Sequence, residues 1–318
     1  MRHDAVGRRA ALLALGAVGL TALSACAARP SRAPRPRASP TSIIAPPRPS
    51  ASTQPSGAPT AVPIHSPASA GPPRHPDPST APPDLDALAA GVAGRTPTAW
   101  GTDLPGIRRT LDAPYDTDGA ARIALTFDAC GGSRGRGYDS ALIEGLMAAQ
   151  VPATLFLNSR WIAANTAVAA QLVGNPLFSI GNHGTAHVPL SVTGRAAYDI
   201  PGTGSAREAL DEVWGNHENL RLLIGRPPTM FRAGTAHYDD IAVGLVRALG
   251  EQPVGFSVNG DGGATYSAAT VRSEVGTATA GAIVLAHMNQ PSSGTAAGML
   301  RAIGDLRARG VRFVHVDA

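Results

Sequence analysis

The chain has 318 residues, with 27 Lys and Arg against 23 Asp and Glu, so its formal net charge is +4. A good deal of this positive charge comes from arginines in the first 95 residues, so it does not indicate nucleic acid binding and fits contact with anionic membrane or wall polymers better. The two cysteines are Cys26 and Cys130, which excludes a disulfide within the segment that follows residue 95.

The first 26 residues have the pattern of an export signal. Arg2, Arg8 and Arg9 precede an apolar run over 10–23, which is too short to span a bilayer comfortably and is typical of a signal-peptide core. The segment ends at Cys26 in the letters LSAC, which resemble the bacterial lipobox. The resemblance implies an exported protein whose lipidated Cys26 anchors it to the outer face of the cytoplasmic membrane. An ordinary secretory signal, which would give a secreted protein, is the alternative.

Residues 27–95 are dominated by Pro, Ser, Ala, Thr and Arg and have no apolar periodicity. Proline removes backbone hydrogen-bond donors, and few apolar groups are available for burial. We expect a disordered, semi-extended linker that crosses the cell-wall layer.

Residues 96–318 alternate apolar runs of strand type with helical patterns, over a length that suits one domain. Several of the runs are apolar throughout, as in parallel strands covered on both faces. The predicted strands are 121–127, 153–158, 177–181, 229–233, 254–259, 282–287 and 312–316. The predicted helices are 138–150, 205–223, 239–249, 268–278 and 295–309.

This alternation predicts an α/β fold, either a distorted seven-stranded (β/α) barrel or a doubly wound parallel sheet. In both folds the active site lies at the C-terminal ends of the strands. Reactive side chains gather at those predicted ends. They are Asp128, Cys130, His183, His187, Arg232, Asn259, Asp261 and His287.

His183 and His187 are four residues apart in a glycine-containing segment that suggests a turn. Such a pair is more often solvated than ligating when it stands alone. A carboxylate and a further histidine at neighbouring strand ends favour a metal site instead.

Five segments of this domain, in order, resemble the motifs of the polysaccharide deacetylases of the NodB-homology type, carbohydrate esterase family 4. The segments are LTFDACGG, HGTAH, FRAGTAHYDD, GFSVNGDGG and IVLAHMN, within residues 110–318. The resemblance implies that Asp128 is the catalytic base, oriented by Arg232. It implies that His287 is the general acid, held and charge-tuned by Asp261.

The resemblance also implies a divalent metal held by His183 and His187. The family's second aspartate completes the metal site, and Ala129 stands in its place. Cys130 could supply the third ligand, giving a set of two histidines and one cysteine that favours zinc. Asp128 could ligate the metal itself, or the metal could be weak or absent. Cys130 is equally well explained as a small buried residue at a tight turn.

The third motif departs from the family pattern too, since Ala233 and Gly234 replace two prolines and Thr235 replaces an aromatic residue. The wall of the substrate groove is therefore expected to differ. Amide hydrolysis needs an activated water, a proton acceptor and a proton donor, which this residue set could supply. We expect a monomeric, metal-dependent hydrolase that removes N-acetyl groups from a cell-wall or other polysaccharide. The alternative is a non-catalytic relative that binds glycan.

Overall fold

The computed structural model describes residues 82–318. The expected signal peptide, its Cys26 and the predicted linker up to residue 81 lie outside the described residues. Among the described helices, none combines the length and the apolar character that a membrane crossing requires.

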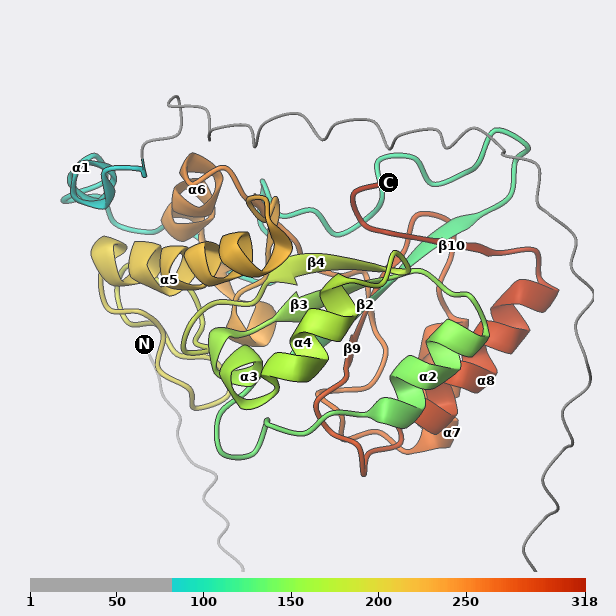
Figure 1. The fold of residues 1–318 in the computed structure, drawn as a ribbon. Coiled ribbons are helices and arrows are strands. Elements are labelled where there is room, and N and C mark those ends of the chain that lie inside the picture. The colour runs from blue at the N-terminus through green and yellow to red at the C-terminus, as the bar shows by residue number, and fades with distance from the viewer. Residues whose placement is uncertain (1–81) are drawn as a thin grey trace, which may run out of the picture. The chain divides into compact units, whose positions relative to one another are not determined.

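A parallel sheet forms the centre of the fold and curls into a half-barrel, as the ribbon shows (Figure 1). Its strands follow the order β7-β5-β4-β3-β2-β9-β8, and β10 pairs with the first half of β2. They are β2 Arg122–Ala129, β3 Ala153–Leu157, β4 Phe178–Asn182, β5 Met230–Phe231, β7 Gln252–Pro253, β8 Val258–Asn259, β9 Ile283–His287 and β10 Arg312–Val314. The curled sheet matches the expected distorted barrel rather than an open, doubly wound sheet.

The two faces of β2 show how the sheet is packed. Ile123, Leu125, Phe127 and Ala129 belong to the core cluster shared with the surrounding helices. Because side chains alternate along a strand, the residues between them face the inside of the curled sheet. That inside is filled by one small apolar cluster, made of Leu111, Ala124, Phe156, Met230, Val254, Ile283 and Val316. Asp128 lies on this inner face, at the C-terminal end of the strand.

The helices gather in two groups (Figure 1). α2 and α7 both pack against α8, and α5 packs against α1 and α6. The helices are α1 Leu85–Ala90, α2 Ser140–Ala148, α3 Ser159–Ala164, α4 Thr166–Val173, α5 Ala206–Ile224, α6 Asp240–Ala248, α7 Ala268–Gly276 and α8 Thr295–Ala308. Helix α5 is capped at its N-terminus, since the Ser205 side chain accepts a hydrogen bond from the Glu208 amide.

Each of the seven predicted strands has a counterpart, although β5 and β8 are shorter than expected. The sequence patterns missed β7, the helices α3 and α4, and a small antiparallel pair formed by β1 Trp100–Gly101 and β6 Tyr238–Asp239. The expected end of the linker at residue 95 is wrong. Helix α1 lies inside that segment, and its Leu85 and Leu88 pack against the core cluster that includes α5 and α6.

Candidate active site

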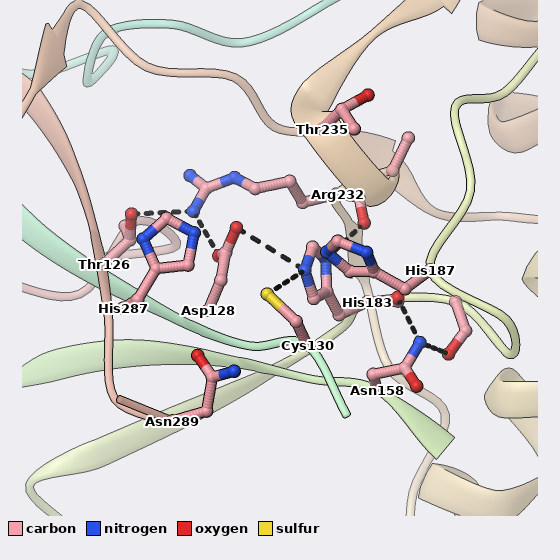
Figure 2. A network of polar contacts seen from close by, with 12 residues as sticks. Thr126, Asp128, Cys130, Asn158, His183, His187, Arg232, Thr235, His287 and Asn289 are labelled. Atoms are coloured by element: carbon pink, nitrogen blue, oxygen red, sulfur yellow. Dashed lines mark hydrogen bonds and ion pairs between the residues drawn. The ribbon is translucent and has the colours of Figure 1, made fainter. Parts of the chain in front are cut away.

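The predicted site residues meet at the C-terminal ends of β2, β4, β5 and β9, as Figure 2 shows for most of them. A pocket of about 610 Å³ opens there, and Asp128, Cys130, His187 and His287 line it. This volume lies within the range of roughly 300–1,000 Å³ that is usual for ligand pockets.

Arg232 is fully buried and fixes the Asp128 carboxylate. Its Nη1 donates to Asp128 Oδ1 at 2.8 Å and to Thr126 Oγ1 at 2.8 Å. Its remaining donors reach the carbonyl oxygens of Val254 at 3.2 Å and Gly255 at 2.9 Å. Together these hydrogen bonds hold the guanidinium in one orientation. A buried charge is tolerated when it is paired and hydrogen-bonded in this way.

The charge state of Asp128 follows from these neighbours. Burial alone would raise the pKa of its carboxyl. The positive charge of Arg232, with smaller contributions from His183 and His287, outweighs burial and lowers the pKa below its usual value. Asp128 is therefore an ionised carboxylate at neutral pH and can accept a proton.

His183 is held from both sides. Its Nδ1–H donates to the Arg232 carbonyl at 2.8 Å, and the Asn158 amide donates to the His183 carbonyl at 2.9 Å. Its Nε2 then faces Asp128 Oδ2 at 3.5 Å and Cys130 Sγ at 3.8 Å (Figure 2). A backbone carbonyl on one imidazole nitrogen, with the other nitrogen turned into the site, is the usual arrangement of a metal-ligating histidine.

The loop that carries His187 is organised by Glu212 of α5. The Glu212 carboxylate accepts hydrogen bonds from the amides of Ala186 at 2.8 Å and His187 at 2.9 Å. His187 itself has a left-handed backbone, with φ of 58°. A Cβ at Gly184 would come within 2.3 Å of the Glu212 carboxylate, so only glycine allows this close approach.

Cys130, His183 and His187 form the one group among residues 82–318 whose side chains could hold a metal ion. Their candidate ligand atoms all lie within 4.8 Å of one another. Burial raises the pKa of the Cys130 thiol, but the charge of His187 and hydrogen bonds to the surrounding histidines lower it well below its usual value. The thiolate is the form of cysteine that binds metals. Two imidazoles and one thiolate therefore fit a divalent ion, zinc above all.

The position of the missing carboxylate is informative. Ala129 has no exposed surface and packs in the core cluster on the helix side of β2, away from the pocket. Cys130, the next residue, lines the pocket beside Asp128. Asp128 is not part of the group whose ligand atoms lie within 4.8 Å of one another, which leaves the thiol as the better placed third ligand.

His287 and Asp261 form a second pair at the end of β9. His287 Nδ1 lies 2.9 Å from Asp261 Oδ1, and Asp261 Oδ2 accepts from the His287 amide at 2.7 Å and from Thr295 Oγ1 at 2.9 Å. Burial alone would lower the pKa of His287. Hydrogen bonds to Asp261 and Cys130 outweigh burial and raise that pKa well above its usual value. His287 is thus a protonated imidazole whose Nδ1 is held by Asp261 and whose side chain lines the pocket.

The structure brings all seven predicted site residues into this one region. Sequence reasoning missed three supporting residues, Thr126, Asn158 and Glu212. Each acts through a hydrogen bond to a residue far along the chain, with no local pattern to mark it. The available signal for Thr126 and Asn158 was their position near the C-terminal ends of the predicted strands 121–127 and 153–158.

Comparison with known proteins agrees with this architecture. Residues 116–254 match the family model for polysaccharide deacetylase. A family 4 carbohydrate esterase from Bacillus anthracis is similar in structure, with 21% identity, a TM-score of 0.52 and a match over 70% of this chain and 95% of that chain. PdaA from Bacillus subtilis, also a family 4 carbohydrate esterase, has 20% identity and a TM-score of 0.53, over 75% of this chain and 89% of that chain.

A pseudoenzyme of the same esterase family, from Bacillus anthracis, is also similar. It has 21% identity and a TM-score of 0.52, over 62% of this chain and 64% of that chain. This chain therefore spans just under two thirds of that protein's length. A search of curated proteins finds no match. At these identities the likeness to solved structures concerns the fold, and it is shared by family 4 carbohydrate esterases and a pseudoenzyme of that family alike.

Proposed function

We propose that the domain, of which residues 116–254 match the family model for polysaccharide deacetylase, hydrolyses the N-acetyl groups of a cell-wall or other polysaccharide. One observation carries the proposal: a carboxylate kept ionised and an imidazole kept protonated line the same pocket. They are Asp128, paired with Arg232, and His287, paired with Asp261. Binding a glycan would need neither a matched base nor a matched acid.

The two pairs divide the proton transfers between them. Asp128, held as a carboxylate by Arg232, takes the proton of the attacking water. His287 gives a proton from Nε2 to the leaving amine, while Asp261 holds Nδ1 and stabilises the imidazolium. Each group thus begins the reaction in the protonation state that its role requires.

Cys130, His183 and His187 would hold the divalent ion that the family implies, and zinc suits this ligand set best. A divalent ion there supplies Lewis acidity, which lowers the pKa of water and polarises a carbonyl. The Arg232 carbonyl and Glu212 supply the outer support, because they fix His183 and the His187 backbone.

A non-catalytic, glycan-binding role is the second candidate. It is favoured by Ala129, which faces the core and leaves the site without the family's second carboxylate. For either role we propose an exported monomer that acts on wall polymers. The lipobox-like end of the N-terminal segment supports a lipid anchor at Cys26, on the outer face of the cytoplasmic membrane.

Acetate release from peptidoglycan and from N-acetylglucosamine oligomers tests the enzyme against the binding protein. The zinc-loaded full chain should release acetate, and Asp128→Asn should lower kcat roughly 100- to 10,000-fold, as expected for loss of a general base. Asp305→Asn is the control, since Asp305 is a half-exposed carboxylate that pairs with Arg272 at 2.6 Å outside the pocket. Unchanged kcat in Asp128→Asn would refute the base assignment. No acetate from the zinc-loaded wild type on either substrate would favour the binding role.

A further inference from the structure

Tyr198 lies at the tip of a tight hairpin beside the pocket. The amides and carbonyls of Ala197 and Ile200 exchange two hydrogen bonds, at 3.1 and 2.9 Å. The two residues between them, Tyr198 and Asp199, have φ of 51° and 60°. Positive φ at both central residues is the signature of a type I′ turn, in which Asn and Gly are favoured. A tyrosine is an unfavourable choice for this backbone, so its presence needs a reason beyond the turn itself.

The Tyr198 ring is exposed yet supported from behind. Its side chain is 78% exposed, and its ring meets the His237 ring edge-on, with centroids 5.4 Å apart. His237 in turn lies 5.7 Å from Trp100, which carries the Arg195 guanidinium at 5.2 Å. The His237 contact supports the Tyr198 ring on one side, and the high exposure leaves most of the ring open to solvent. The hairpin therefore presents an exposed aromatic surface.

This surface is continuous with the catalytic pocket. Tyr198 and Ile200 line the same cavity as Asp128 and His287, and Tyr266 also contributes to its lining. A part of the ligand that lies against Tyr198 would therefore share the cavity with the part that reacts at Asp128.

Two polar atoms in the lining of the pocket lack a partner among residues 82–318. They are the Oδ1 of Asn289, a residue only 2% exposed, and the Oγ1 of Thr235. The Asn289 amide nitrogen is already bound to the Gly135 carbonyl at 3.2 Å, so Oδ1 is the free end (Figure 2). A buried polar atom without a partner carries a cost that a ligand can remove. The pocket is therefore suited to a ligand that carries hydroxyl or amide groups.

We propose that Tyr198 is a glycan-binding residue that stacks on a sugar ring next to the one whose acetyl group is removed. The inference rests on the proposed function and adds to it a second sugar-binding position, beside the sugar that reacts. A pyranose has an apolar C–H face and a rim of hydroxyls. The Tyr198 ring meets the apolar face, while the unpartnered Asn289 Oδ1 and Thr235 Oγ1 belong to residues that line the same pocket. The strained turn is then explained, because it places the ring at the mouth of the pocket.

Binding of an N-acetylglucosamine pentamer to the full chain, measured by calorimetry in an Asp128→Asn background, tests this role. Tyr198→Asn places a favoured residue in the type I′ turn and removes the ring. We expect it to weaken the binding of the pentamer roughly fivefold, the size of one aromatic contact, with a melting temperature at or above that of the parent. Tyr198→Phe keeps the ring and should bind as the parent does.

Tyr115→Ala is the matched control, because Tyr115 is also exposed, at 58%, but lies outside the pocket. Equal pentamer affinity for Tyr198→Asn, Tyr198→Phe and Tyr115→Ala overturns the proposal, as does a parent protein that does not bind the pentamer. Acetate release by the wild type is scored separately. Weaker binding in Tyr198→Asn without acetate release from the wild type would support the glycan site and refute the enzyme.

Discussion

At the scale of single residues, Ala129 and Cys130 show how one step along a strand decides which side chain reaches the site. Ala129 faces the helices with Phe127, whereas Cys130 lines the pocket with Asp128. The sequence pattern placed the missing ligand at 129 and offered Cys130 only as one of several replacements. Strand alternation, seen in the folded chain, favours the cysteine.

Cys130→Ala should therefore weaken zinc binding at least tenfold, because one of the three candidate ligands is lost. The cobalt-loaded wild type should also show a thiolate-to-metal charge-transfer absorption that Cys130→Ala lacks. Equilibrium dialysis and absorption spectra measure the two effects.

Ala129→Asp is the companion variant. Restoring the family's aspartate there should add no ligand and should instead destabilise the fold, because it buries a carboxylate in the core cluster. Tighter zinc binding in Ala129→Asp, or an unchanged charge-transfer band in Cys130→Ala, would contradict this assignment.

At the scale of elements, α5 serves the site although none of the predicted site residues lies on it. Its Glu212 is 5% exposed and accepts two amides of the loop between His183 and Val188. Burial raises the pKa of Glu212, and the loop amides partly offset this effect. The helix thus fixes the backbone of a candidate ligand without touching the pocket directly.

Glu212→Gln should loosen this loop, since the amide side chain keeps one acceptor and brings a donor toward the loop N–H groups. We expect zinc affinity to fall roughly tenfold, the usual size of an outer-support effect. Glu218→Gln, on the same helix at a more exposed position, is the control. Zinc dissociation constants by competition with a chelating dye measure the difference, and equal values for the two variants would refute the positioning role.

At the scale of the whole molecule, a buried polar network joins β4, α5 and the segment after α6. Glu251 Oε1 accepts from Asn182 at 2.9 Å and lies 2.8 Å from His217 Nδ1, and Asn216 donates to Asn182 at 2.8 Å. Glu251 Oε2 has no partner among the described residues. Burial, only partly offset by His217 and Asn182, raises the pKa of Glu251 to about 7.

This pKa makes global stability depend on pH. The unfolded carboxyl titrates near pH 4.5, so between about pH 4.5 and 7 the folded state binds more protons than the unfolded state. The free energy of unfolding must therefore fall as pH rises through that window, by up to about 3 kcal/mol from this group.

Glu251→Gln should flatten this part of the profile, and Glu274→Gln, an exposed glutamate, should leave it unchanged. Urea unfolding at several pH values, with chelator present so that metal binding adds nothing, measures the slopes. Parallel profiles for Glu251→Gln and wild type would show that Glu251 does not titrate in this range.

The sequence by itself determined most strands of the central sheet and the end of that sheet at which the site lies. Apolar runs over 121–127 and 282–287 predicted strands, and the polar residues after them predicted a cluster at the strand ends, because alternation and chain direction are local properties. The tertiary structure alone decided that Ala129 lies in the core, that α1 belongs to the folded domain, that Glu212 binds the His187 loop and that Tyr198 lines the pocket. These facts depend on contacts between segments far apart in the chain, such as the 25 residues that separate His187 from Glu212, and no local pattern encodes them.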